Sequence, residues 1–298
     1  MSRSVETSSP LTNNRRMSKQ QEVKPVFGLP DLQRAAPIFR RRWAAAVGRR
    51  LMKWLSIDKV NTIHAKHCHL RGAAFTSAML ADPMMDVRYR VHHPERLDTL
   101  PEGAFITVSN HPIGSLDGII LIDLFASRRP DFRVMVNGML ERIWAMADNF
   151  ISVTPKTGKQ TAPNQANVNG VRIALEGLRS GHPIGFFPAG AMSFGTSHGE
   201  VLDRPWTHSV IRLIRKSGVP VYPVCFDFRN SPFFYLLGRI SWQLRTLRVA
   251  TEAFNKRGRT ADVYVGSPIS PQVIHSYTND TDLANFLYRT TYALPKEG

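Results

Sequence analysis

After about residue 86, the chain alternates between short apolar runs and segments with helical periodicity. The apolar runs include AFITV, FRVMV, IGFFP and VPVYPVCFDF, and helical segments such as SVIRLIRKS lie between them. Runs that are apolar throughout are typical of strands covered on both faces, as in a parallel sheet. Gly181 and Gly218 follow two of the helical segments, where helix C-caps are expected. The pattern predicts an α/β fold, with a mostly parallel central sheet flanked by helices.

The first 85 residues have a different character. Residues 1–28 are polar and offer little to bury, so we expect a disordered basic tail. Residues 29–85 are predicted to form an N-terminal helical arm, and residues 86–298 one large domain. In the arm, apolar residues recur at helical spacing between arginines, namely Phe39, Trp43, Val47, Leu51, Trp54 and Leu55. This amphipathic helix either packs on the main domain with a solvated arginine face or lies in an anionic membrane interface.

The charge of the chain is strongly positive and unevenly distributed. The formal net charge is +16, and residues 1–60 contribute +9 of it from 13 Lys and Arg against 4 Asp and Glu. Such an excess indicates an anionic partner, which is a nucleic acid, a membrane surface or a phosphorylated ligand. Two cysteines, Cys68 and Cys225, are too few for a disulfide framework and suit a reducing compartment.

The sequence carries no hydrophobic segment of the kind that directs export or spans a bilayer. No apolar run reaches the ~18 residues that a membrane-spanning helix needs, and the first thirty residues have no apolar signal core. We therefore expect a protein that is neither exported nor membrane-spanning, on the cytosolic side.

The stretch SNHPIGSLD, residues 109–117, directly follows the run AFITV. On a straight helix, six positions turn the chain through about 600°, so His111 and Asp117 would lie on different faces. Pro112 and Gly114 allow a turn before a helix that begins near Ser115, and such a turn brings the carboxylate back to the imidazole. A carboxylate on one ring nitrogen fixes the tautomer and leaves the other nitrogen as a general base. The alternative is a histidine and an aspartate that only cap a helix.

Two further segments place small or basic residues where strands are predicted to end. In IGFFPAGAMSFG, a strand leads into residues 188–191, where small residues and glycine allow a ligand to approach the backbone closely. In the segment that begins at LDRPW, a helix and the strand VPVYPVCFDF are followed by Arg229 and Asn230. Each pattern alone has low specificity.

Taken in order, these segments resemble a known family. NHPIGSLD, FFPAGAMS and GVPVYPVCF are similar to the first, third and fourth motifs of the glycerophospholipid acyltransferase superfamily, which includes the 1-acylglycerol-3-phosphate acyltransferases. LDRPW, FRNSPFFYLLGRI and NKRG…VGSPI resemble a divergent bacterial branch, with hemolysin-like proteins and O-acyltransferases that make amino-acid lipids such as ornithine lipid. The resemblance covers about residues 100–270 and implies that residues 86–298 are an acyltransferase domain.

The resemblance implies a reaction and two catalytic residues. A fatty acyl group would pass from acyl-CoA or acyl carrier protein, each a co-substrate rather than a cofactor, to a hydroxyl of a lyso-lipid in membrane lipid biosynthesis. His111 would remove the hydroxyl proton, Asp117 would orient His111, and the hydroxyl would attack the thioester directly. The leaving thiol has a pKa of about 8.5, so its departure needs no strong protein acid. A backbone N–H or a bound water near the helix start would stabilise the oxyanion.

The same resemblance implies the substrate contacts and the location. Asn110, Gly114 and the segment Phe187, Pro188, Ala189 and Gly190 would line the substrate site, and no metal is needed. The partners would be the acyl donor, the lyso-lipid acceptor and an anionic membrane surface, but not a nucleic acid. The enzyme would lie peripherally on the cytoplasmic face of the membrane.

The chain departs from the family pattern at the positions that usually bind the acceptor phosphate. The third motif commonly reads Phe-Pro-Glu-Gly-Thr-Arg, whereas Ala189 and Met192 stand in place of the Glu and the Arg. In the second motif, Val153 stands where an arginine is usual. The acceptor head group is therefore left open. The basic residues that could replace the missing groups are Lys156, Lys159, Arg204 and Arg229.

Gly195-Thr196-Ser197-His198-Gly199 matches the G-x-S-x-G pattern of serine hydrolases. That motif requires a strand directly before the first glycine and a helix directly after the second. Here IGFFP ends seven residues earlier and EVLDRPW follows. A hydrolase with Ser197 as nucleophile is therefore the minor alternative.

Two other features of the sequence suggest a zinc site and a nucleic-acid-binding function. HAKHCH, residues 64–69, suggests zinc, but a structural site takes four ligands and the sequence has no partner cluster at a typical spacing, so these residues are expected to lie at the surface and interface of the arm. A nucleic-acid-binding protein would also explain the charge, but the basic excess lies on the tail and arm and no nucleic-acid motif is present.

Overall fold

The computed structural model describes residues 24–153, 165–196 and 198–296, and within them the centre of the fold is a seven-stranded sheet in the order β1-β9-β8-β2-β5-β3-β4. Five of its neighbouring pairs are parallel, and β8 and β9 pair antiparallel. The predicted α/β fold with a mostly parallel sheet is confirmed. The strands are β1 (Arg88–His92), β2 (Ile106–Ser109), β3 (Arg133–Asn137), β4 (Phe150–Val153), β5 (Ile184–Phe186), β8 (Val221–Asp227) and β9 (Thr260–Val265).

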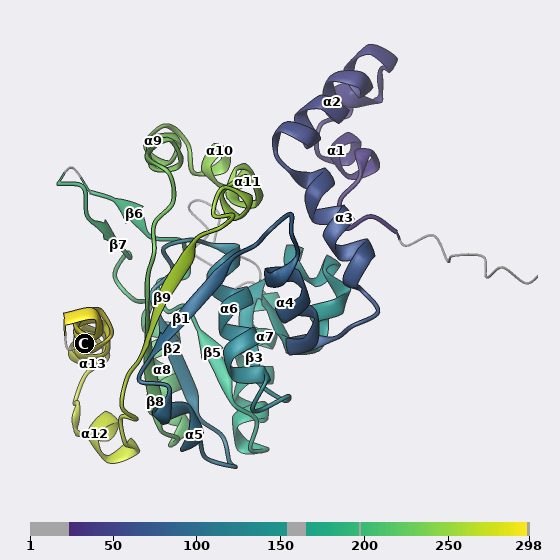
Figure 1. The fold of residues 1–298 in the computed structure, drawn as a ribbon. Coiled ribbons are helices and arrows are strands. Elements are labelled where there is room, and N and C mark those ends of the chain that lie inside the picture. The colour runs from purple at the N-terminus through teal and green to yellow at the C-terminus, as the bar shows by residue number, and fades with distance from the viewer. Residues whose placement is uncertain (1–23, 154–164, 197, 297–298) are drawn as a thin grey trace, which may run out of the picture.

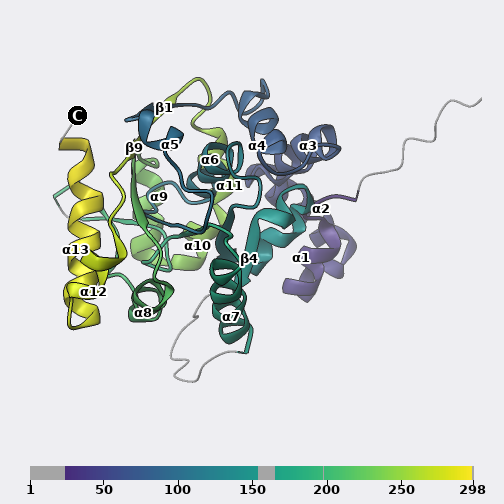
Figure 2. The same ribbon diagram turned by 90° about the horizontal axis from the view of Figure 1, so that it is seen from below.

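Helices cover both faces of the sheet, as Figure 2 shows from below. On one face, α4 and α6 bury their side chains in a core with β1, β8 and β9, and on the other face α7, α8 and α13 form a second apolar core. Burial on both faces explains why the central strands β2, β5 and β8 are almost entirely apolar. These helices are α4 (Gly72–Ala81), α6 (Ser115–Ala126), α7 (Gln165–Arg179), α8 (His208–Ser217) and α13 (Asp280–Ala293).

The predicted helix ends are also present. Gly218 is the C-cap of α8, with a left-handed φ of +65°, and Gly181 has a φ of +88° just after α7. Both conformations favour glycine because it has no Cβ. The shorter helical segments are α3 (Ile57–His67), α5 (Glu95–Asp98), η2 (Gly138–Arg142), η3 (Trp144–Asn149), α12 (Pro271–Ser276) and η4 (Leu294–Lys296).

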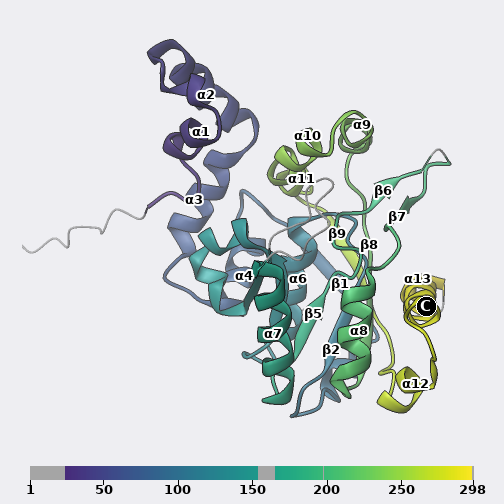
Figure 3. The same ribbon diagram turned by 180° about the vertical axis from the view of Figure 1, so that it is seen from behind.

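The N-terminal arm consists of α1 (Leu29–Ala35), η1 (Pro37–Arg40) and α2 (Arg42–Trp54), which extend away from the body in Figures 1 and 3. The predicted tail, residues 1–28, lies outside the described residues up to residue 23. Farther along the same predicted arm, α3 and α4 belong to the body, because Ile63 and Phe75 are buried in its core.

The face of α2 that packs differs from the predicted one. Ala44 and Gly48 are buried, and a Cβ added to Gly48 would lie 2.9 Å from Cδ2 of Leu32 on α1. Trp43 and Val47, which the spacing placed on the apolar face, are exposed instead. The short side chains make the helix contact because they let the two backbones approach closely.

The three segments that carry the family motifs meet at one edge of the sheet. The first motif follows β2, the third begins at the end of β5, and the fourth forms β8. These strands run parallel, so their carboxyl ends lie together. The β6–β7 hairpin (Phe194–Gly195 and Val201–Leu202) and the helices α9 (Pro232–Ile240), α10 (Trp242–Leu247) and α11 (Val249–Phe254) extend beyond this edge in Figure 1.

Candidate active site

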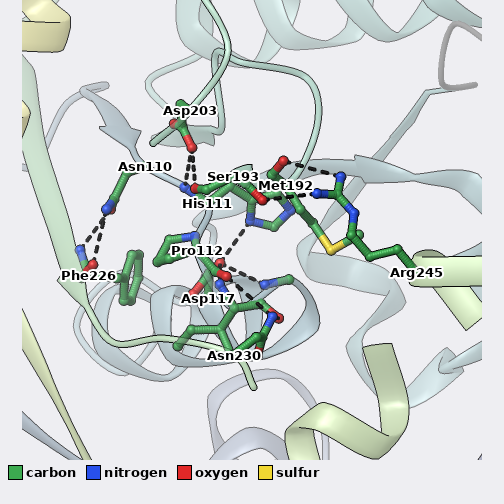
Figure 4. Close-up of polar contacts among 12 residues, drawn as sticks. Asn110, His111, Pro112, Asp117, Met192, Ser193, Asp203, Phe226, Asn230 and Arg245 are labelled. Carbon is green, nitrogen blue, oxygen red and sulfur yellow. Dashed lines mark hydrogen bonds and ion pairs between the residues drawn. The ribbon is translucent and has the colours of Figure 1, made fainter. Parts of the chain in front are cut away.

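His111 and Asp117 are in contact at the carboxyl end of β2. Nδ1 of His111 lies 2.9 Å from Oδ2 of Asp117, and the Asp117 side chain is completely buried (Figure 4). A carboxylate only accepts hydrogen bonds, so the ring carries its proton on Nδ1. Nε2 takes part in none of the hydrogen bonds within the described part of the chain. The ring is 19% exposed, which leaves this nitrogen available as a base.

The turn between the two residues holds the carboxylate in place. Oδ2 of Asp117 also accepts the backbone N–H groups of Ile113 and Gly114, each at 2.9 Å. Gly114 has a φ of +93°, and a Cβ there would lie 2.8 Å from Sδ of Met192, so glycine fits this position. The helix α6 then begins at Ser115, as the sequence predicted.

These contacts exclude two candidates for the oxyanion stabiliser. The N–H groups of Ile113 and Gly114 are both engaged by Asp117, so neither points freely at a substrate. Gly114, predicted to bind substrate, instead supports the catalytic carboxylate and gives space to Met192.

The third motif, after β5, packs directly against the histidine. The Phe187 ring stacks on the His111 ring, with centroids 4.2 Å apart and planes inclined by 29°. Pro188 and Ala189 are buried, Gly190 is exposed with a φ of +65°, and the carbonyl of Pro188 accepts the N–H of Thr207. The structure therefore places Phe187, at the start of this segment, against His111.

A second buried aspartate holds the backbone of His111. Oδ1 of Asp203 accepts the N–H of His111 at 3.2 Å and the hydroxyl of Ser193, while the carbonyl of His111 accepts the N–H of Ser193 at 2.8 Å. Burial raises the pKa of Asp203, and the hydrogen bond from Ser193 and the nearby His111 act against this rise. Both polar groups of the His111 main chain are thus tied to other elements (Figure 4).

Arg245, on α10, supports the loop that contains Ser193. Its guanidinium donates to the carbonyls of Ser193 at 3.1 Å and Met192 at 3.4 Å, and its side chain is buried. An arginine from a distant segment therefore binds the backbone at the place where the common third motif has an arginine of its own.

Asn110 has a structural role that differs from its predicted one. Its Nδ2 donates to the carbonyl of Phe226 at 3.0 Å, and its Oδ1 accepts the N–H of Phe226 at 2.7 Å. Because the buried amide is engaged at both ends, Asn110 joins the catalytic loop to β8 instead of binding substrate with its side chain.

Asn230 gives the loop a further support. Its Nδ2 donates to the carbonyls of Pro112 and Ile113, at 3.3 and 3.1 Å. The next residue, Ser231, caps α9 and is held by the buried Glu252 through its N–H and its hydroxyl. The start of α9 is therefore fixed relative to the catalytic loop.

Sequence similarity identifies the family. The model of a family described as acyltransferase matches residues 28–297, almost the whole chain. The chain belongs to this acyltransferase family. The enzyme class predicted from the motifs is therefore confirmed.

Two characterised relatives of this acyltransferase are named lyso-glycine lipid O-acyltransferase. The protein from Phocaeicola vulgatus is 30% identical over 206 residues, which is 66% of this chain and 71% of that protein. The protein from Bacteroides thetaiotaomicron is 29% identical over 252 residues, covering 82% of this chain and 88% of that protein. Among solved structures, the 1-acyl-sn-glycerophosphate acyltransferase PlsC from Thermotoga maritima matches with a TM-score of 0.46 and 15% identity, over 75% of this chain and 81% of that one.

Arg204 and Arg229, two of the basic residues predicted to bind the acceptor, do not contact His111 or Asp117 in the described part of the acyltransferase. Arg204 follows Asp203 directly and is exposed, close enough to Arg245 for the two charges to repel. Arg229 is exposed at the end of β8, donates to the carbonyl of Gly199, and lines an open depression with Arg259. Lys156 and Lys159 lie outside the described residues.

Among the supporting residues, Asn230 was named with Arg229 in the sequence, without a role, whereas Asp203, Ser193 and Arg245 were not predicted. Asp203 and Asn230 lie within LDRPW and FRNSPFF, the two stretches that resembled the divergent branch, so the resemblance held a signal. No sequence pattern marks Ser193 and Arg245, because each contacts residues that are distant in the sequence.

The hydrolase alternative does not have its structural context. Gly195 ends the short strand β6, and after Gly199 the chain continues into the strand β7 instead of a helix. A nucleophile elbow requires a strand and a helix around the serine. Ser197 itself lies outside the described residues.

The residues of HAKHCH serve packing in the described part of the acyltransferase. His64 is buried between the rings of Phe75 and Trp144, and burial lowers its pKa, while His67 contacts Asp82 at 2.8 Å. Among the described residues, no group of three or more His, Cys, Asp or Glu side chains is placed to hold a metal ion. Nor does any helix of that part combine the length and apolar character needed to cross a membrane.

Proposed function

We propose that this acyltransferase transfers a fatty acyl group from a thioester, acyl-CoA or acyl carrier protein, to the hydroxyl of a lyso-lipid. The observation that carries the proposal is the contact of His111 Nδ1 with the buried carboxylate of Asp117, which leaves Nε2 free to act. Nε2 takes the hydroxyl proton as the oxygen attacks the thioester carbonyl. The C–S bond then breaks, and the thiolate leaves and takes a proton from the imidazolium or from water.

The proposed reaction proceeds without an acyl-enzyme intermediate. The acceptor oxygen is itself the nucleophile, so one base and one orienting carboxylate serve the whole reaction. The orienting role fits Asp117, because its oxygen is held by two backbone N–H groups and cannot turn away from the imidazole.

For the acceptor, we propose a lyso-amino-acid lipid rather than lysophosphatidic acid. The two named relatives act on lyso-glycine lipid, and this chain has no Glu or Arg at the positions of the third motif that bind phosphate in the common pattern. Arg245 does not replace them as a phosphate ligand, because its guanidinium is buried and engaged by two carbonyls.

We further propose that the enzyme works on the cytoplasmic face of a membrane, held there peripherally. Its acceptor and product are lipids, and coenzyme A and acyl carrier protein are soluble carriers of the cytoplasm. The arm supports this location, since residues 32–57 contain seven Lys and Arg and no Asp or Glu, and Trp43 and Trp54 are exposed.

The test is an assay of thiol release with the purified protein. Acyl-CoA and acyl carrier protein are offered in turn with an N-acyl glycine lyso-lipid, an N-acyl ornithine lyso-lipid, lysophosphatidic acid or no acceptor. We expect release that depends on an amino-acid lyso-lipid, and mass spectrometry should find the O-acylated product. Release that is equally fast without any acceptor would instead indicate a thioesterase, and preference for lysophosphatidic acid would overturn the proposed acceptor.

A further inference from the structure

Six large apolar side chains are exposed on the two helices that follow β8. They are between 45% and 70% exposed, and Phe233, Leu236 and Ile240 are spaced to lie on one face of α9. We call the whole set the α9–α10 face: Phe233, Leu236, Ile240, Trp242, Leu244 and Leu247. A contiguous exposed apolar surface of this kind marks an interaction site.

The charge around this face has one sign. Residues 230–251 contain no Asp or Glu, and Arg239 and Arg248 lie among the exposed side chains, whereas Arg245 is buried. An apolar face with a cationic rim is the character of a helix that lies in an anionic lipid interface. Pairing of two copies through the same face would bring arginines against arginines, which disfavours a dimer.

The α9–α10 face is continuous with the exposed face of the arm. The guanidinium of Arg248 lies 4.7 Å from the ring of Trp54 at the end of α2 and 5.4 Å from the ring of Phe233 on α9. The hydroxyl of Thr251, on α11, also donates to the carbonyl of Trp54 at 3.4 Å. Figures 1 and 3 show α2 and α9–α11 beyond the same edge of the sheet.

This surface adjoins the catalytic loop. Asn230, directly before α9, donates to the carbonyls of Pro112 and Ile113, and a Cβ on Gly114 would lie 3.3 Å from Val249 of α11. The elements that carry the exposed apolar side chains are therefore fixed to the turn that positions His111.

We propose that the α9–α10 face and the outward face of α2 (Trp43, Val47 and Trp54) dock together on an anionic lipid bilayer. A surface that extends over both the body and the arm defines an orientation, whereas the arm alone is a single tether. In that orientation the carboxyl edge of the sheet, with His111, faces the membrane, so that the hydroxyl of a membrane lipid reaches the base without leaving the interface. The inference deepens the proposed action on a lipid acceptor, but its test does not depend on turnover.

The experiment measures binding of the full chain to vesicles without any acyl donor. Vesicles of phosphatidylglycerol and phosphatidylcholine are compared with phosphatidylcholine alone by co-sedimentation. The variant Leu236→Ser/Ile240→Ser/Leu247→Ser removes apolar area without changing the charge. Val273→Ser, an exposed position on α12 at the opposite end of the sheet, is the matched control.

We expect the triple variant to bind anionic vesicles at least about tenfold more weakly than the wild type, since three buried apolar contacts are lost. The control should bind as the wild type does. Equal binding of the triple variant and the wild type would overturn the proposal, because the arm would then suffice. Conversion of a wild-type dimer into a monomer, with vesicle binding unchanged, would assign the face to a second copy of the chain and also overturn it.

A second measurement does not rely on the triple variant being folded. Brominated phosphatidylglycerol quenches tryptophans that enter the acyl region, and the change Trp242→Phe isolates the contribution of α10. We expect quenching of the wild type to fall in Trp242→Phe. Identical fractional quenching in both proteins would place Trp242 outside the bilayer and contradict the proposed orientation. If binding and quenching succeed while acyl transfer fails, the surface stands and only the proposed reaction falls.

Discussion

The backbone N–H of His111 donates to Oδ1 of Asp203 at 3.2 Å, across 92 positions of the sequence. The same oxygen accepts the hydroxyl of Ser193, whose own N–H donates to the carbonyl of His111. Asp203 therefore joins the first motif to the third. It is a positioning residue, because it acts on the main chain of the base and not on the reacting atoms.

Loss of the Asp203 contact should lower kcat more than it changes KM. In Asp203→Ala the His111 backbone loses its acceptor, and a displacement of about 1 Å is enough to lower the rate on the order of 100-fold. Asp203→Asn retains an acceptor oxygen and should recover part of the rate. Steady-state kinetics of both variants, per folded molecule, measure the effect. An unchanged kcat in a folded but less stable Asp203→Ala protein would reduce its role to stability.

Substitution of the catalytic pair should abolish transfer. His111→Ala removes the base, and general-base catalysis contributes about 100- to 10,000-fold. Asp117→Asn has a similar shape but permits the wrong imidazole tautomer, so its loss should also be large. Thiol release with and without acceptor measures both changes. Near-normal turnover in a folded His111→Ala protein is the outcome that this mechanism does not survive.

Restoring the common third motif should not improve the enzyme. Ala189 is buried in an apolar cluster, so the carboxylate of Ala189→Glu would be placed among apolar side chains, and Met192 fills the space beside Gly114. We expect Ala189→Glu/Met192→Arg to lose activity on the native acceptor and to gain none on lysophosphatidic acid. A large gain on that lipid, together with good wild-type activity on it, would contradict this prediction.

The residues of the G-x-S-x-G pattern should be dispensable. Ser197→Ala and His198→Ala are expected to retain activity within about threefold, since neither takes part in the proposed chemistry. The measurement is thiol release by each variant, with His111→Ala as the inactive reference. Detection of an acyl group on Ser197 by mass spectrometry after trapping would reverse the conclusion.

Asp82, at the end of α4, is held by residues of α3, and this contact should make the free energy of unfolding depend on pH below about pH 4. Burial alone would raise the pKa of Asp82, but hydrogen bonds from Lys66, His67 and the N–H of Met84 outweigh it and lower that pKa to about 2. Because the folded pKa is below the unfolded one, the stabilisation is complete above pH 4 and is lost as the pH falls toward 2.

The size of this contribution follows from the shift of the Asp82 pKa. It corresponds to about 2 kcal/mol at neutral pH. Urea unfolding of the wild type and Asp82→Asn should show a difference in the free energy of unfolding at pH 6 that shrinks by pH 2.5. Asp58→Asn, at an exposed position on α3, is the control and should show no such change. A difference between the wild type and Asp82→Asn that is independent of pH would refute the prediction.

Some features were predictable because they depend on nearby residues. Strands apolar on both faces, helix ends at glycine, and the turn that returns Asp117 to His111 all follow from short-range periodicity and backbone freedom. The motif order then predicted the acyltransferase family. The predicted contact of the catalytic pair needed only six positions of chain and one left-handed glycine.

Other features required the folded chain. On α2, spacing placed Trp43 and Val47 on an apolar face but left open whether the protein or a membrane covers it; close packing against α1 uses Ala44 and Gly48 and leaves the large side chains exposed. A hydrophobic pattern records which residues are apolar, and it does not record whether another helix or a membrane covers them.

The alternation of strands and helices and the residues of the first motif already determined an α/β acyltransferase, and they predicted His111 as its base. The tertiary structure alone decided what holds that base in place and what surrounds it. Asp203 and Asn230 reach the loop of His111 from separate segments, and Arg245 binds the neighbouring loop at Ser193. Arg248 brings Trp54 beside Phe233. Such contacts depend on the order of strands in the sheet, which brings distant segments to one edge, and no local pattern encodes that order.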